Sequence, residues 1–202
     1  MIDWSCIDTV LLDMDGTLLD LHFDNFFWSE HLPRTYALRH QISKEESSAY
    51  LYGECGAAQG TLQWYSLDPW SQRLDMDIAA LKRELQHMIS ARPVAIEFLT
   101  QLHHSHRDVV MVTNAHRKTL EIKMDNINII HWFDRVVVSH DLLAPKEEQD
   151  FWHRLQQLHP FDPSLTLLID DTEQVLASEQ QYGIAHFLTF TPPANHRHKR
   201  IR

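Results

Sequence analysis

Short, continuous apolar runs recur along the two outer parts of the chain. Runs rich in Val, Ile and Leu that do not alternate with polar residues are typical of strands buried on both faces. Five such strands are expected, at 10–12, 109–112, 135–139, 165–169 and 186–190. Strands that need cover on two sides indicate a parallel sheet.

Amphipathic segments separate most of these runs. The apolar positions from Ala95 to Leu102 recur at i, i+3, i+4 and i+7, the spacing of a helix with one apolar face. Further helices are expected at 117–125, 147–158 and 173–182. The alternation predicts an α/β fold, a doubly wound parallel sheet of about five strands with helices on both faces.

The stretch from Leu21 to about Arg92 has a different character, because helix-compatible sequence rich in Trp, Tyr and Phe replaces the strand-like runs. Asp24 is expected to cap a first helix that runs towards Gln41, with a kink or break at Pro33. The later signals are a capping box at 43–46 before a helix over 47–52, interruptions at Gly53, Gly56 and Gly60, a helix restarting at Asp68-Pro69, and a last helix over 78–90. We therefore expect a core of residues 1–20 and 93–202 with an all-helical insert, residues 21–92.

Composition narrows the class of protein. The chain has 202 residues, 44% of them hydrophobic and 23% charged, which suits a globular fold with a sizeable core. The formal net charge of −10 argues against a nucleic-acid polymer as partner, because binding to a phosphate backbone needs a basic surface. A small phosphorylated metabolite bound together with a metal ion remains compatible.

The two cysteines and the apolar segments bear on the compartment. Cys6 and Cys55 form neither a disulfide framework nor a metal-ligand spacing, which indicates a reducing compartment. Apolar runs are much shorter than the roughly 20 residues that span a bilayer, and the N-terminus does not resemble a signal peptide. We expect a cytoplasmic protein that does not enter a membrane.

Polar side chains follow several of the expected strands. Asp13 and Asp15 come directly after the first strand, and a carboxylate pair so spaced on extended chain points to one side. Thr113-Asn114 ends the second strand, Lys146 follows the third, and Asp170-Asp171 ends the fourth. An acidic turn is the alternative for Asp13 and Asp15 alone. The carboxyl ends of parallel strands meet at one edge of a sheet, so these groups are expected to converge.

The chemistry of that edge suits a phosphoryl group. Several carboxylates can hold one Mg2+ through hard oxygen ligands, which relieves their mutual repulsion. The cation, Lys146, the Thr113 hydroxyl and the Asn114 amide can surround a dianionic phosphoryl group. One carboxylate can then attack phosphorus, and a second can protonate the leaving oxygen and later activate water.

These residues resemble the four motifs of the haloacid dehalogenase-like hydrolase superfamily, in the family's order. The motifs are Asp13-Met14-Asp15-Gly16-Thr17, Thr113-Asn114, Lys146 and Asp170-Asp171. The resemblance implies that Asp13 is the nucleophile, that Asp15 is the general acid and base, and that Lys146 offsets negative charge. It also implies that Thr113 and Asn114 bind the transferring phosphoryl group.

The resemblance implies a Mg2+ cofactor as well. The ion would be held by the Asp13 side chain, the Asp15 backbone carbonyl and a carboxylate of the fourth motif. Asp171 is expected to be the direct ligand, with Asp170 helping directly or through water. Members that cleave carbon–halogen bonds lack the second acid, so Asp15 favours phosphoryl transfer, and the insert corresponds to the helical cap that closes over the site.

The string from Asp13 to Trp28 resembles more narrowly the purine 5′-nucleotidases that act on GMP and IMP. Aromatic residues of the insert offer surface to stack a purine, although they can equally fill its small core: Phe26, Phe27, Trp28, Trp64, Tyr65 and Trp70. Glu54 and Gln63 are candidates to contact the purine edge. A sugar-phosphate phosphatase or phosphomutase is the alternative enzyme, and a phosphate-binding regulatory protein is the alternative without catalysis.

Overall fold

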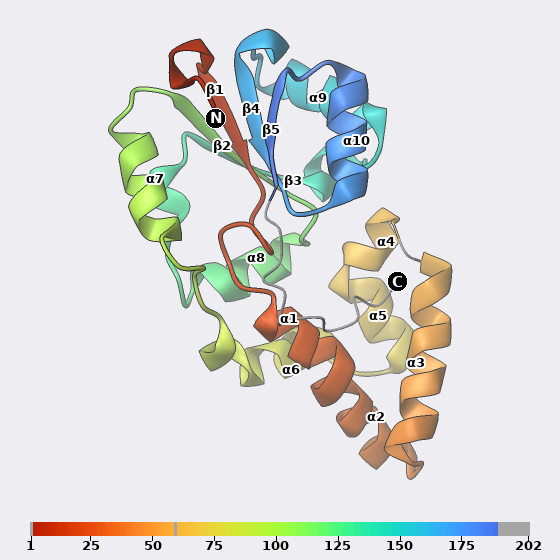
Figure 1. The fold of residues 1–202 in the computed structure, drawn as a ribbon. Coiled ribbons are helices and arrows are strands. Elements are labelled where there is room, and N and C mark those ends of the chain that lie inside the picture. The colour runs from red at the N-terminus through yellow and green to blue at the C-terminus, as the bar shows by residue number, and fades with distance from the viewer. Residues whose placement is uncertain (1, 59, 190–202) are drawn as a thin grey trace.

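A computed structural model describes residues 2–58 and 60–189, and these residues form a five-stranded sheet (Figure 1). All strands run parallel in the order β3-β2-β1-β4-β5. Their bounds are β1 Thr9–Leu12, β2 Asp108–Thr113, β3 Arg135–Val138, β4 Thr166–Ile169 and β5 His186–Leu188. The predicted parallel sheet is confirmed, with β1 at its centre. The expected fifth strand is shorter than predicted, and its last position, residue 190, lies outside the described residues.

Helices cover both faces of the sheet, as the unbroken apolar strands required (Figure 1). The flanking helices are α7 Ala95–His103, α8 Arg117–Met124, α9 Gln149–Leu158 and α10 Glu173–Tyr182. Val10 and Leu12 of β1 pack in one core cluster with residues of α7 and α8. Leu11 points the other way, into a cluster with Trp152 of α9 and Val175 of α10. The doubly wound fold therefore follows from alternate residues of each strand being buried in opposite directions.

The described elements between β1 and α7 are all helical. They are α1 His22–Phe26, a π-helical turn Phe27–His31, α2 Leu32–His40, α3 Lys44–Ala58, α4 Leu62–Tyr65, α5 Leu67–Leu74, α6 Ile78–Glu84 and a 3-10 turn Gln86–Met88. We call residues 22–88 the helical segment. It lies beyond the carboxyl ends of the strands (Figure 1).

Two short backbone contacts mark where the chain leaves and rejoins the sheet domain. Asp20 donates its N–H to the Ser90 carbonyl at 2.9 Å, and Arg92 donates to the Leu18 carbonyl at 2.8 Å. The outgoing and returning segments thus lie side by side, which supports the proposed division at residues 21–92.

Several local predictions for the helical segment need correction. Of the kink or break expected at Pro33, the break is wrong: a π-helical turn connects α1 to α2, and Pro33 lies in the first turn of α2, where its missing N–H costs little. Gly53 does not end a helix but lies inside α3. Gly60, with φ of +79°, follows that helix.

The helix boundaries also shift. The capping box is confirmed, because Ser43 N–H donates to Glu46 Oε2 at 2.9 Å and Glu46 N–H to Ser43 Oγ at 3.1 Å. α5 begins at Leu67, two residues before Pro69, and the last predicted helix ends early, at Glu84, followed by the 3-10 turn. No helix within residues 2–58 and 60–189 is both long and apolar enough to cross a membrane.

Candidate active site

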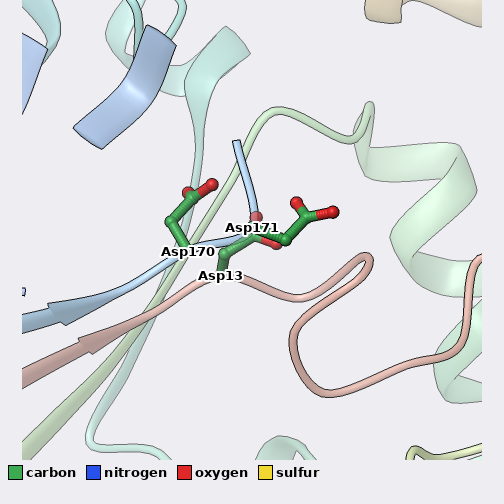
Figure 2. A group of neighbouring side chains, drawn as sticks. All are labelled: Asp13, Asp170 and Asp171. Atoms are coloured by element: carbon green, nitrogen blue, oxygen red, sulfur yellow. The ribbon is translucent and has the colours of Figure 1, made fainter. Parts of the chain in front are cut away.

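Three carboxylates meet where β1 and β4 end (Figure 2). The pairing of Leu12 with Ile169 brings Asp13 next to Asp170, and the Asp13 N–H donates to the Ile169 carbonyl at 3.0 Å. One oxygen each of Asp13, Asp170 and Asp171 lies within 4.8 Å of the others. The register of two neighbouring strands therefore builds the acidic cluster that the sequence predicted.

Lys146 lies within this cluster and joins two of its carboxylates. Its Nζ is 2.6 Å from Asp13 Oδ1, 2.6 Å from Asp170 Oδ2 and 3.2 Å from the Val112 carbonyl. Burial lowers the pKa of Lys146, but the adjacent Asp13 and Asp170 outweigh it and raise the pKa above the usual range. Lys146 is therefore charged and offsets carboxylates that are themselves buried. It lies three residues before α9, which begins at Gln149 rather than at the predicted residue 147.

Gly16 has a left-handed backbone conformation and lies against the Asp171 carboxylate. The φ of Gly16 is +84°, and a Cβ at this position would lie 2.3 Å from Asp171 Oδ2. Both Asp170 oxygens already accept hydrogen bonds, Oδ2 from Lys146 and Oδ1 from the Thr172 N–H at 2.8 Å.

Thr113 is the last residue of β2 and Asn114 follows it, and both are buried. Asn114 Oδ1 accepts from the Lys146 N–H at 3.0 Å, and Thr113 Oγ1 accepts from the Ala115 N–H at 3.0 Å. Asn114 Nδ2 donates to Glu147 Oε2 at 2.9 Å. The predicted site residues Asp13, Thr113, Asn114, Lys146, Asp170 and Asp171 thus lie at one edge of the sheet.

Glu147 and Tyr65 connect that edge to the helical segment, and sequence reasoning did not assign them this role. The Tyr65 hydroxyl of α4 donates to Glu147 Oε1 at 2.7 Å. His140 Nε2 lies 3.0 Å from the Leu62 carbonyl, also in α4. α4 of the helical segment therefore contacts the sheet edge that holds Asn114, because Asn114 is bonded to the same Glu147 side chain.

Asp13 and Asp15, whose spacing predicts that they point to one side, pair with different lysines. Asp15 Oδ1 accepts from Lys123 Nζ at 2.5 Å, whereas Asp13 pairs with Lys146. The strand ends at Leu12, and the chain bends at Met14, between the two acids. Burial raises the pKa of Asp15, with Lys123 opposing it.

The sequence pattern contains a signal for a buried role of Lys123, which was not among the predicted site residues. It stands at i+3 from Leu120 and directly before Met124, on the buried side of α8. A lysine on the apolar side of an amphipathic helix needs a buried carboxylate partner. Asp24, expected as a helix cap, is one of these partners: it lies inside α1 and accepts from Lys123 at 2.5 Å.

The aromatic residues of the helical segment divide into two groups. Phe27 and Trp70 are buried and fill its core, whereas Trp28 and Trp64 are half-buried. The rings of Trp28 and Trp64 stack on each other, with ring centres 6.3 Å apart and planes 13° apart.

Glu54, a candidate to contact the purine edge, pairs with Arg73 at 3.1 Å.

Glu179 of α10 is a buried carboxyl group without a hydrogen-bond partner among the described residues. Burial, with Asp170 nearby, raises its pKa to about 9, so it is neutral at pH 7. The pKa of Glu179 is higher in the folded than in the unfolded protein. The protonated side chain therefore contributes fully to the free energy of unfolding below the unfolded pKa, and this contribution is lost as pH rises from about 4.5 to 9.

We therefore expect Glu179→Gln, which cannot ionise, to gain stability over wild type as pH rises. The gain in free energy of unfolding should be roughly 1–4 kcal/mol larger at pH 8 than at pH 5. Urea unfolding of both proteins at the two pH values measures it. If the substitution changed the free energy of unfolding equally at pH 5 and pH 8, the raised pKa of the Glu179 carboxyl group would be contradicted.

Comparison with known proteins gives the family of this chain. The model of the haloacid dehalogenase-like hydrolase family matches residues 10–188. The chain belongs to that family. Its first motif holds two acids, Asp13 and Asp15, and most of its length is similar to a curated nucleotidase. It is therefore a hydrolase of phosphoric monoesters.

Relatives support this placement. The chain is 38% identical over 192 residues to GMP/IMP nucleotidase YrfG of Escherichia coli, covering 95% of this chain and 86% of that protein. Among solved structures, a HAD phosphatase from Thermococcus onnurineus superposes with a TM-score of 0.81 at 17% identity, over 96% of this chain and 90% of that one. L-2-haloacid dehalogenase from Xanthobacter autotrophicus has a TM-score of 0.59 at 16% identity, over 88% and 75% of the two chains. These structures share the fold.

Proposed function

We propose that this hydrolase is a Mg2+-dependent 5′-nucleotidase that converts purine nucleoside monophosphates, GMP and IMP, to nucleoside and phosphate. The observation that carries the proposal is the buried contact of Lys146 with Asp13 and Asp170, next to Asp171. Thr113 and Asn114 lie at the same edge of the sheet. The 38% identity to a GMP/IMP nucleotidase supports the substrate class. The protein is proposed to act in the cytoplasm on a free nucleotide.

The acidic cluster fits Mg2+. Its donors are all carboxylate oxygens, the hard ligands that this ion prefers, and they already lie within 4.8 Å of one another. The Asp13 side chain, the Asp171 carboxylate and the Asp15 backbone carbonyl would hold the ion, with Asp170 assisting. Bound there, Mg2+ supplies positive charge that draws a phosphate dianion to an otherwise acidic site.

Asp13 is the proposed nucleophile. Its carboxylate attacks phosphorus, and the bond from phosphorus to the nucleoside 5′ oxygen breaks as an aspartyl-phosphate forms. Asp15 gives its proton to that departing oxygen, consistent with the raised pKa of this carboxyl group. The Lys146 ammonium, the Thr113 hydroxyl and the Asn114 amide stabilise the transferring phosphoryl oxygens.

The second half-reaction reverses the role of Asp15. The Asp15 carboxylate takes a proton from water, the water oxygen attacks phosphorus, and the Asp13 carboxylate is released with free phosphate. The use of one residue first as acid and then as base leaves the enzyme in its starting protonation state.

Residues 21–92, which contain the helical segment, are the proposed cap that closes over the site and chooses the leaving group. α4 reaches the site edge through Tyr65 and Glu147, which places the half-buried Trp64 on the same element. Trp64 is therefore the aromatic residue that we propose to stack on the purine. Phe27 and Trp70, being buried, support the cap core instead.

Metal removal and a substrate panel test this function together. With excess EDTA, hydrolysis of GMP should fall by at least about 100-fold, and added Mg2+ should restore it, because Mg2+ supplies charge the site lacks. Across GMP, IMP, AMP and glucose 6-phosphate, kcat/KM should be at least roughly 10-fold higher for the first two. A preference for glucose 6-phosphate would favour a sugar phosphatase, and inactivity on every monophosphate with Mg2+ would favour a regulatory phosphate-binding protein.

A further inference from the structure

Three charged side chains from separate parts of the fold form a cluster with Asp15, the proposed general acid. Lys123 of α8 donates to Asp15 Oδ1 and to Asp24 Oδ2, both at 2.5 Å. Lys82 of α6 donates to the other Asp24 oxygen at 2.7 Å. We call Asp15, Asp24, Lys82 and Lys123 the four-charge cluster.

The lysines of this cluster are almost fully removed from solvent. The side chains of Lys82 and Lys123 are each 2% exposed. The Lys82 ammonium lies 4.8 Å from the ring centre of Phe27 and 4.9 Å from that of Phe23, within the range of a cation–π contact. Burial of an unpaired ammonium costs several kcal/mol, so each lysine depends on a carboxylate partner.

The two lysines differ in what they contact. Lys82 joins α6 to Asp24 of α1, and both of these elements belong to the helical segment. Lys123 comes from the sheet domain and contacts both Asp24 and Asp15. Lys123 therefore connects the proposed general acid to the first helix of the helical segment.

We propose that Lys123 is a positioning residue that fixes the Asp15 carboxylate for proton transfer and makes its position depend on α1 through Asp24. The inference rests on the proposed function, in which Asp15 protonates the leaving group and activates water. Asp15 follows a bend in the chain and its side chain is 25% exposed, so the hydrogen bond from Lys123 holds one of its oxygens in place. Proton transfer needs a heavy-atom separation of about 2.6–3.2 Å, and a displaced acid loses it.

This arrangement predicts a dependence on the leaving group. A nucleoside 5′ oxygen leaves as a poor alkoxide and requires the proton of Asp15, whereas p-nitrophenolate leaves without one. The second step, attack of water on the aspartyl-phosphate, requires Asp15 whatever the first substrate was. A displaced Asp15 therefore slows aspartyl-phosphate formation from GMP but not from p-nitrophenyl phosphate.

The test compares Lys123→Met with Lys82→Met in the full chain with Mg2+. Lys82→Met is the matched control, because it removes the same charge from the same cluster and leaves the Lys123–Asp15 contact intact. For Lys123→Met, kcat/KM on GMP, or on the best alkyl monophosphate of the panel, should fall about 10- to 100-fold, the usual cost of a misplaced catalytic group. The kcat/KM of Lys123→Met on p-nitrophenyl phosphate should change by less than about threefold. Lys82→Met should keep the wild-type ratio of kcat/KM on GMP to kcat/KM on p-nitrophenyl phosphate.

A rapid-mixing experiment adds a second readout. Lys123→Met should release about one equivalent of p-nitrophenolate per enzyme in a burst before slower turnover, because the hydrolysis of its aspartyl-phosphate is impaired. Lys123→Gln keeps a polar end group and is expected to disturb the fold less. It should show the same large loss of kcat/KM on GMP and small loss on p-nitrophenyl phosphate.

Three results would overturn the inference. Equal losses on both substrates in Lys123→Met and Lys123→Gln would mean that these variants damage the site generally. The same substrate split in Lys82→Met would assign the effect to the cluster's charge rather than to the Lys123 contact. A wild-type enzyme inactive on both substrates would contradict the proposed function itself, and the inference with it.

Discussion

Replacement of Lys146 by Met is expected to lower both stability and activity strongly. Asp13 and Asp170 are 5% and 1% exposed, and the ammonium that lies 2.6 Å from each would be gone. Removal of one partner from a buried ionic contact costs about 3–5 kcal/mol, because the remaining charges stay buried and unpaired. Urea unfolding without added metal measures this loss.

The activity of Lys146→Met should fall by roughly 100- to 1,000-fold in kcat, since a positive charge aimed at the transferring phosphoryl group is lost. Added Mg2+ should recover part of the stability, because a cation again separates the carboxylates. Lys118→Met is the matched control: Lys118 pairs with Asp68 on the surface, and an exposed pair contributes only about 0–1 kcal/mol. Equal stability losses for the two variants would show that Lys146 does not neutralise the buried acids.

Asp13→Asn is expected to abolish turnover with little change in fold. The amide has nearly the shape of the carboxylate, but it is not a nucleophile and cannot form the aspartyl-phosphate. The loss in kcat should be at least about 10,000-fold, the scale seen when a nucleophile is removed. Steady-state hydrolysis of GMP, with circular dichroism to confirm folding, measures it.

Asp8→Asn provides the control for that substitution. Asp8 is exposed and precedes β1, at the opposite end of the strand from Asp13. Its replacement changes the net charge by the same amount and should leave kcat unchanged. Comparable activity of Asp13→Asn and wild type would remove Asp13 from the role of nucleophile.

Most of the sheet and the acidic edge could be predicted because the determining signals are local. Continuous apolar runs marked strands buried on both faces, and parallel pairing of β1 with β4 then placed Asp13 beside Asp170 without further information. The positions of Lys146, Thr113 and Asn114 followed from the same rule, since each comes after a strand of the same sheet.

The contacts between the helical segment and the site could not be predicted in this way. Asp24 has the local features of a helix cap, but its partners, Lys82 and Lys123, lie 58 and 99 residues away in the chain. The contact between Tyr65 and Glu147 likewise spans 82 residues. Such pairs depend on how packed elements face one another, which a single sequence does not encode as a local pattern.

The distinct partners of Asp13 and Asp15 sharpen the account of the site. The spacing of the two acids alone predicted that both carboxylates point to one side, whereas in the structure Asp15 pairs with Lys123 and Asp13 pairs with Lys146. Separation of the two carboxyls into different charge environments is what different catalytic roles require.

The central claim is that phosphoryl transfer passes through Asp13, and locating the covalent phosphate tests it most directly. Enzyme mixed with Mg2+ and p-nitrophenyl phosphate is quenched in acid within the first turnovers, digested, and sequenced by tandem mass spectrometry. The account predicts one added phosphoryl group on Asp13 in wild type, more of it in Lys123→Met, and none in Asp13→Asn. A phosphoryl group on any other residue, or turnover without a covalent phosphoenzyme, would contradict it.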